Sequence, residues 1–178
     1  MHNFPGRTYA AIDGSNFYST SKALGIEVDF GKLLALLNEG TDLLRVSYFT
    51  AIDESGTTGV RPLCDWLAFN GFNVVTKPAK TYSGTDGQRR LKGNMDIEIT
   101  VDALEMAKHF DTYVLFSGDG DFTYLVKALQ RAGKRVVVVS ALNQSVLSDD
   151  LRRAADRFVD LGEKGMMAKL ARKRDVAA

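Results

Sequence analysis

Four aspartates occupy positions from which they could act together as metal ligands. Asp13 ends the apolar run TYAAID, Asp119 and Asp121 follow the apolar run TYVLFS, and Asp96 opens a predicted helix. Carboxylate oxygens are the ligands that Mg²⁺ and Mn²⁺ prefer, and a divalent cation would offset the repulsion between crowded carboxylates. The residue types favour such a site over a zinc site, because both histidines are isolated and the chain has a single cysteine, Cys64.

Each of these aspartates also has an ordinary structural explanation. Asp96 and Asp119 could cap helices, and Asp13-Gly14 could be a plain turn. Asp102 stands six residues after Asp96, roughly 240° further round a helix, so the two would not share a face and Asp102 could support the site or lie at the surface. Two polar residues are candidates for contacting a ligand or for local capping alone: Asn16 and Ser117.

The elements that must position these residues alternate between strand and helix. Continuous apolar runs predict strands at 8–13, 43–50, 72–77, 112–117 and 135–140, with a last strand at 157–161. Capping residues and glycine stops predict helices at 29–38, 58–70, 95–109, 120–132 and about 148–155. A turn-rich, basic loop is expected at 78–93. This order predicts an α/β fold with three α/β/α layers around a mainly parallel sheet.

Parallel strands end at a common edge, where ligands bind in open α/β sheets. The four aspartates should therefore converge there despite their separation in the sequence. Segment 77–92 contains five basic residues and one acidic residue, a net charge of +4, close to the predicted position of Asp96. This local charge, in a chain whose overall net charge is only +1, allows nucleic acid as a partner without requiring it.

Length and composition exclude several classes of protein. With 178 residues, 45% hydrophobic and 25% charged, the chain is expected to form one globular domain at 1–162, followed by a basic tail at 163–178 that is helical or disordered. Its longest apolar runs are shorter than the roughly 20 residues that cross a bilayer. The lone cysteine and the absence of a signal-peptide core predict a cytoplasmic protein without a membrane partner. A homo-oligomer is compatible with the sequence.

Three segments, AIDGSNFY (11–18), KGNMD (92–96) and SGDGDF (117–122), resemble in order the motifs of the NYN domain family, which belongs to the PIN-like ribonuclease group and includes LabA-like bacterial proteins. The resemblance covers about residues 8–161. It implies a PIN-like fold and a nuclease dependent on Mg²⁺ or Mn²⁺. It also implies that the family's acidic and Asn positions are those of Asp13, Asp96, Asp119, Asp121 and Asn16, and that Asp102 matches a further acidic position. Met95 replaces the usual valine.

The expected function is hydrolysis of RNA phosphodiester bonds by a metal-activated water. The residues expected to contact RNA, in addition to Ser117, are Lys77, Lys80, Arg89, Arg90, Lys92 and Tyr18. A catalytically inactive nucleic-acid-binding or regulatory domain of the same fold is the alternative. A haloacid-dehalogenase-type phosphatase fits poorly, because Ala11 stands where a second aspartate is needed, and a primase-like site would need a glutamate at the end of the first strand. No G-x-G-x-x-G follows the first strand, which disfavours a dinucleotide-binding module.

Overall fold

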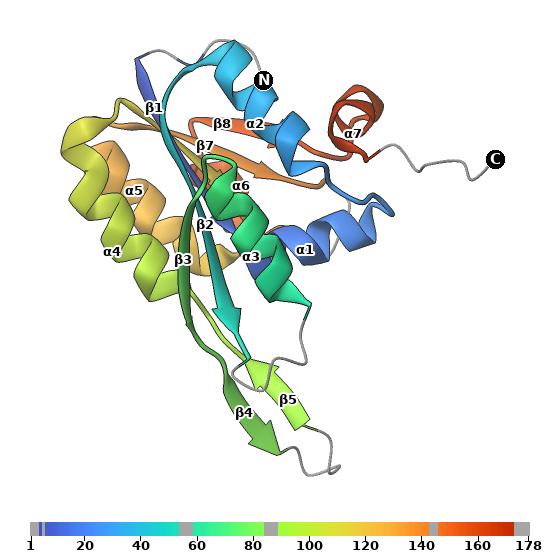
Figure 1. Ribbon diagram of the computed structural model, residues 1–178. Helices are drawn as coiled ribbons and strands as arrows, with labels where there is room; N and C mark the ends of the chain where they lie inside the picture. The colour runs from blue at the N-terminus through green and yellow to red at the C-terminus, as the bar shows by residue number, and fades with distance from the viewer. Residues whose placement is uncertain (1–3, 5, 54–58, 84–88, 143–145, 173–178) are drawn as a thin grey trace.

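A six-stranded, entirely parallel sheet forms the centre of the molecule (Figure 1). The structure is a computed structural model that describes residues 4, 6–53, 59–83, 89–142 and 146–172. The order of the strands is β3-β2-β1-β6-β7-β8, and all five neighbouring pairs are parallel. Their bounds are β1 Arg7–Asp13, β2 Asp42–Ile52, β3 Asn73–Pro78, β6 Thr112–Phe116, β7 Arg135–Ser140 and β8 Arg157–Asp160.

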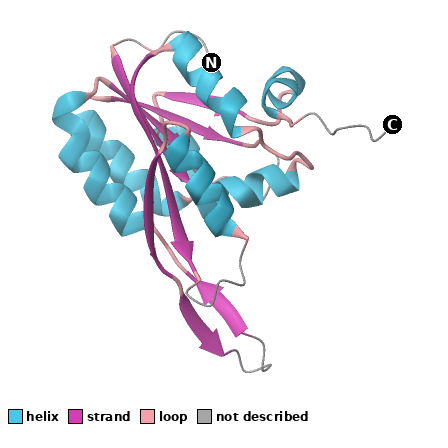
Figure 2. Ribbon diagram, in the orientation of Figure 1, coloured by secondary structure: helices cyan, strands magenta, loops and turns pink. Residues whose placement is uncertain are grey.

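Helices cover both faces of this sheet (Figure 2). On one face, a core cluster joins the sheet to α1 (Gly14–Ala23), α2 (Phe30–Gly40), α3 (Val60–Phe69) and α7 (Lys164–Leu170). On the other face, a second cluster joins it to α4 (Asp96–Met106), α5 (Thr123–Arg131) and α6 (Asp149–Ala154). The predicted three-layer α/β/α fold with a parallel sheet is therefore confirmed.

The apolar runs of the central strands are continuous because helices bury both of their faces. In β1, Ala10 and Ile12 belong to the first core cluster, whereas Tyr9 and Ala11 belong to the second. All five residues of β6 are buried. Side chains alternate across a strand, so a strand covered on one side only would show alternating polarity instead.

Segment 78–93 differs from its prediction as a loop. It contains β4 (Lys80–Ser83) and β5 (Arg89–Lys92), which pair antiparallel and form a separate two-stranded sheet. This arm extends from the carboxyl edge of the main sheet, away from the helical layers (Figure 1). Turn-forming residues dominate the composition of this segment, so the sequence pattern did not indicate the two short strands on either side of the turn.

The chain after Gly162 also contributes to the fold. Leu170 of α7 is fully buried in the first core cluster, and Ala171 forms an antiparallel bridge with Val28. The part of this segment that the structure describes, 163–172, therefore packs against the predicted domain. In the described part of the chain, no helix is long and apolar enough to span a bilayer.

Candidate metal centre

The topology explains why residues from β1 and β6 meet. The chain runs outward from β1 through β2 to β3, and then returns to the other side of β1 with β6, β7 and β8. The connection after β1 runs to one side of the sheet, and the connection after β6 runs to the other side. Where two neighbouring strands are followed by connections in opposite directions, a crevice opens at their carboxyl ends. Asp13 ends β1, and the loop that carries Asp119 follows β6. Both therefore lie at this switch point.

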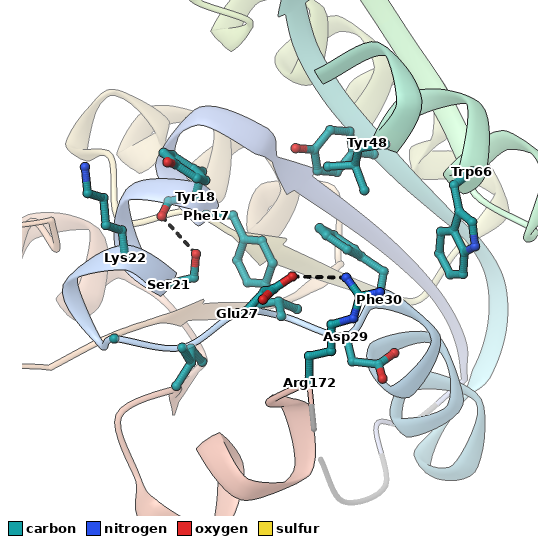
Figure 3. A pocket seen from close by; sticks show the side chains of 14 residues that line it. Phe17, Tyr18, Ser21, Lys22, Glu27, Asp29, Phe30, Tyr48, Trp66 and Arg172 are labelled. Carbon is teal, nitrogen blue, oxygen red and sulfur yellow. Dashed lines mark hydrogen bonds and ion pairs between the residues drawn. The ribbon is translucent and has the colours of Figure 1, made fainter. Parts of the chain in front are cut away.

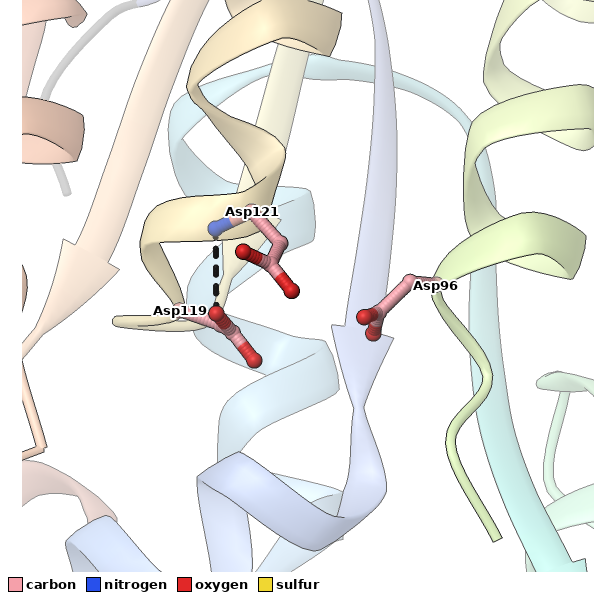
Figure 4. A group of neighbouring side chains, drawn as sticks. All are labelled: Asp96, Asp119 and Asp121. Carbon is pink, nitrogen blue, oxygen red and sulfur yellow. Dashed lines mark hydrogen bonds between the residues drawn. The ribbon is translucent and has the colours of Figure 1, made fainter.

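Three carboxylates converge at the crevice (Figure 4). Asp96, Asp119 and Asp121 each offer an oxygen, and these oxygens all lie within 4.8 Å of one another. Asp13, Asp96 and Asp119 also line one pocket of about 310 Å³, together with Ser15, Asn16, Ser19, Gly93 and Asn94. The four aspartates of the sequence motifs are thus brought to one place, as the parallel sheet predicted.

Asp13 is held by hydrogen bonds from three directions. It is 5% exposed, and one carboxylate oxygen accepts from Ser15 Oγ at 2.9 Å and from the N–H of Asn16 at 3.3 Å. The other oxygen accepts from Ser117 Oγ at 3.1 Å. Asp13 is the N-cap of α1, so it combines a structural role with a place in the pocket.

Ser117 differs from its prediction as an RNA contact. It is 1% exposed, and its hydroxyl donates to Asp13 and accepts from the N–H of Asp119 at 3.1 Å. A side chain so deeply buried cannot reach a polymer at the surface. Ser117 instead joins two carboxylate-bearing segments that are 106 residues apart in the sequence.

Asn16 ties α1 to the loop after β6. Its Oδ1 accepts from the N–H of Gly118 at 2.9 Å. Because the amide oxygen of Asn16 is engaged in this hydrogen bond, the Nδ2 amide NH₂ group remains to donate to a ligand in the pocket. Asp119 in turn caps the short 3-10 helix Gly120–Phe122 by accepting from the N–H of Asp121 at 3.0 Å.

Asn94 is a residue of this centre that the motifs did not single out. Its Nδ2 donates to Asp96 Oδ2 at 2.5 Å, and its Oδ1 accepts from the N–H of Asp96 at 2.6 Å. This reciprocal pair orients the Asp96 carboxylate at the start of α4. An asparagine whose side chain bonds to the backbone two residues on forms an Asx-turn, and an asparagine just before a predicted helix is the signal in the sequence that could have indicated it.

The remaining predicted residues lie elsewhere. The Tyr9 hydroxyl donates to Asp102, which therefore supports a buried tyrosine on the second core face. Lys77 Nζ forms an ion pair with Glu98 at 2.7 Å. Tyr18 is exposed and lines a different pocket. The four basic residues Lys80, Arg89, Arg90 and Lys92 belong to the arm strands, whose side chains lie outside the described part of the structure.

The electrostatics of the pocket favour a bound cation. Burial raises the pKa of Asp13 above its usual 3.8, with a smaller contribution from the Asp119 carboxylate, and hydrogen bonds oppose the shift. Burial also raises the pKa of Asp96, as do the carboxylates of Asp119, Asp13 and Asp121. Among the described residues that line this pocket, none is a lysine or arginine. An all-oxygen donor set with excess negative charge fits Mg²⁺ or Mn²⁺.

Asp96→Asn is expected to raise the melting temperature of the metal-free protein at pH 7. The raised pKa of Asp96 means that the folded state binds this proton more tightly than the unfolded chain. Stability is therefore lost as the pH rises from 3.8 through the raised value. Thermal unfolding in EDTA between pH 4 and pH 8 checks this prediction. The difference in melting temperature between Asp96→Asn and the wild type should become smaller toward pH 4.

Adding Mn²⁺ at pH 7 should raise the melting temperature of the wild type more than that of Asp96→Asn, because binding to the folded state alone is stabilising. If Asp96→Asn melts at a lower temperature than the wild type in EDTA at pH 7, the negative charge of Asp96 does not destabilise the metal-free fold.

Sequence comparison identifies the family. The NYN domain matches residues 7–162 of the chain. The chain belongs to the NYN domain family. Domains of this family are generally PIN-like nucleases that use divalent metals.

Two known proteins are similar to the chain over most of its length. The chain is 30% identical over 164 residues to the low amplitude and bright protein LabA of Synechococcus elongatus, covering 89% of this chain and 86% of that protein. It is also similar to the crystal structure of VPA0982, a protein of unknown function from Vibrio parahaemolyticus. The TM-score is 0.72 at 28% identity, over 88% of this chain and 93% of the other.

Proposed function

We propose that this NYN domain is a metal-dependent ribonuclease that hydrolyses phosphodiester bonds of RNA. The observation that carries the proposal is the meeting of Asp13, Asp96 and Asp119 in one pocket whose described lining has no cationic side chain. Such a pocket repels a phosphate diester unless a divalent cation lies between them. Asp121 completes the set of carboxylates.

The residues of the chain would divide the work as follows. Asp96, Asp119 and Asp121 would hold Mg²⁺ or Mn²⁺, and Asp13 lines the same pocket from the end of β1. Bound there, the cation would act as a Lewis acid that makes water a better nucleophile and neutralises charge on the phosphate. Ser117 and Ser15 keep the Asp13 carboxylate oriented through their hydrogen bonds.

A neighbouring amide and the expected products complete the proposal. The side-chain NH₂ group of Asn16 can donate to a phosphate oxygen or to water, because Asn16 lines the pocket. Attack by water would leave a 5′-phosphate and a 3′-hydroxyl, and it needs no histidine.

The proposed ribonuclease is tested with labelled single-stranded RNA, structured RNA and DNA, each incubated with Mn²⁺, Mg²⁺ or EDTA. We expect RNA to be cleaved with either metal, no cleavage in EDTA, and products with 5′-phosphates. Cleavage of DNA at the same rate would widen the substrate class. Saturable Mn²⁺ binding without cleavage of any substrate would favour the inactive nucleic-acid-binding domain instead.

The two strands of the arm contain four basic residues and come directly before Gly93 in the sequence. The register of the arm pairs Lys80 with Lys92 and Tyr82 with Arg90. Residues that are opposite each other, or two apart on one strand, share a face of a two-stranded ladder, so these four residues occupy the same face. Gly93, which follows Lys92, lines the carboxylate pocket.

Arg90→Ala is expected to weaken binding of single-stranded RNA and to reduce the slope of log K against log salt by about one, because one phosphate contact is lost. Arg89→Ala is the matched control, because Arg89 pairs with Ser83 and therefore occupies the other face of the arm. Binding titrations at several salt concentrations in EDTA measure both variants. Equal losses of RNA affinity in the two variants would show that RNA does not bind one face of the arm in preference to the other.

A further inference from the structure

A second and larger pocket lies on the other side of α1 from the carboxylates. Its volume is about 700 Å³, within the range of roughly 300–1,000 Å³ that ligand sites occupy. It is bordered by α1, by the segment that leads into α2, by α3 and by Arg172 (Figure 3). Nothing in the proposed hydrolysis uses this pocket.

The pocket has an ordered aromatic floor and an exposed aromatic rim. Phe30 makes edge contacts with Phe17 and Tyr48, at centroid distances of 6.1 and 5.7 Å. Figure 3 shows Tyr18 and Trp66 at opposite ends of the cavity, with Phe17 and Phe30 between them. Tyr18 is 65% exposed and Trp66 is 43% exposed. Large aromatic rings exposed at a surface offer stacking platforms to planar ligands.

The two pockets adjoin each other across the start of α1. Ser15 and Ser19 line the carboxylate pocket, whereas Tyr18 and Lys22 line the aromatic one. Residues three or four apart are neighbours on a helix surface, so only the width of α1 separates the two sites. Tyr48 forms part of the inner wall, and its ring lies so close to Gly14 that a Cβ added there would be 2.7 Å from it.

The lining indicates the chemistry of the ligand. Aromatic walls suit nucleobases, and the Lys22 ammonium suits a phosphate. Arg172 is paired with Glu27 at 3.0 Å and helps to close the lower side of the cavity. Bases in a duplex are stacked on each other and are not available to protein rings, whereas the bases of a single strand are.

We propose that this aromatic pocket binds unpaired bases of the same RNA strand whose phosphate lies at the carboxylates, and so selects single-stranded RNA. The inference rests on the proposed function, because it takes RNA as the substrate. It assigns Tyr18 and Trp66 as specificity-determining residues through base stacking.

Intrinsic fluorescence tests the proposal, because Trp66 is the chain's single tryptophan. The wild type is titrated in Ca²⁺, a hard cation that also takes oxygen ligands, with an oligouridylate of about ten nucleotides, a length within single-strand site sizes. We expect saturable quenching of Trp66, and a Kd that rises roughly tenfold in Tyr18→Ala through loss of one stacked base. Fluorescence anisotropy of end-labelled oligouridylate gives the same comparison for Trp66→Ala.

Three controls make the result decisive. Tyr124→Ala removes a similarly exposed tyrosine from α5, on the opposite face of the sheet, and should leave the Kd unchanged. An abasic ribose-phosphate oligomer of the same length and double-stranded RNA should not quench Trp66. Equal quenching by either probe, or an unchanged Kd in Tyr18→Ala, would overturn the proposal.

Cleavage assays separate this inference from the ribonuclease itself. Mn²⁺-dependent cleavage by a protein whose Kd is insensitive to Tyr18→Ala would retain the nuclease and reject the base pocket. Quenching and a Tyr18 effect without any cleavage would retain the pocket and reject the nuclease.

Discussion

We expect Asp119→Asn to lower the rate of the proposed Mn²⁺-dependent RNA cleavage by about a hundredfold or more. Loss of a partner that merely orients a metal ligand typically costs 10- to 100-fold in metal affinity or activity, and loss of a ligand costs at least as much. Asparagine keeps the shape of the side chain and can still accept the hydrogen bond from the N–H of Asp121. The variant should therefore fold normally and lose only the carboxylate charge. Single-turnover cleavage of a labelled single-stranded RNA measures the effect.

Asp42→Asn provides the matched control for this prediction. Asp42 is exposed at the start of β2, and the amino ends of parallel strands lie at the edge of the sheet opposite the carboxylates. The same chemical change there should leave cleavage within about twofold of the wild type, as is usual for surface substitutions. Full activity in Asp119→Asn, with Mn²⁺ present and the fold intact by circular dichroism, would remove Asp119 from the mechanism.

Gly118→Ala is expected to destabilise the fold by about 3 kcal/mol, the upper part of the usual range for forcing atoms into a packed site. A Cβ at position 118 would lie 2.0 Å from the carbonyl oxygen of Val146 and 2.8 Å from Ser140 Oγ. A backbone carbonyl cannot rotate away as a flexible side chain can. The loop must shift, and it carries the N–H bond to Asn16 and the adjacent Asp119. Cleavage should fall together with stability.

Thermal and denaturant unfolding measure this second effect. For a chain of this size, about 3 kcal/mol corresponds to a fall in Tm of roughly 10 °C. Gly165→Ala is the control, because a Cβ at that position in α7 would meet no atom within 4 Å. Alanine is the better helix former, so this variant should be neutral or slightly stabilised. Similar losses in both variants would show that the close approach at Gly118 is not the cause.

Much of the fold could be predicted because its signals are local. The buried runs at 112–117 and 135–140 became β6 and β7, since a strand covered on both faces needs apolar residues throughout. The predicted helices became α2 to α6, within a few residues at their ends, with 3-10 turns beside α4 and α5. The arm strands were not foreseen, because short segments of mainly polar and basic residues show no hydrophobic period in the sequence.

The carboxylate centre was foreseen from position alone, whereas the roles of the residues around it were not. Parallel strands place their carboxyl ends at one edge, so strand-end aspartates must gather there. The sequence could not reveal that Ser117 would be buried between Asp13 and Asp119, or that Asp102 would accept from Tyr9. The bonds from Ser117 to Asp13 and from Tyr9 to Asp102 each span about a hundred residues, and they depend on how whole layers pack.

By itself, the sequence determined the alternation of strands and helices, the family and the set of acidic residues at the strand ends, because periodicity, capping and motif order are properties of neighbouring residues. Only the tertiary structure decided which oxygens lie within 4.8 Å of one another, which serine orients them, and that α1 separates a carboxylate pocket from an aromatic one. The physical reason is that such contacts form when separate elements bury their apolar faces together, and the resulting distances follow from side-chain packing in three layers.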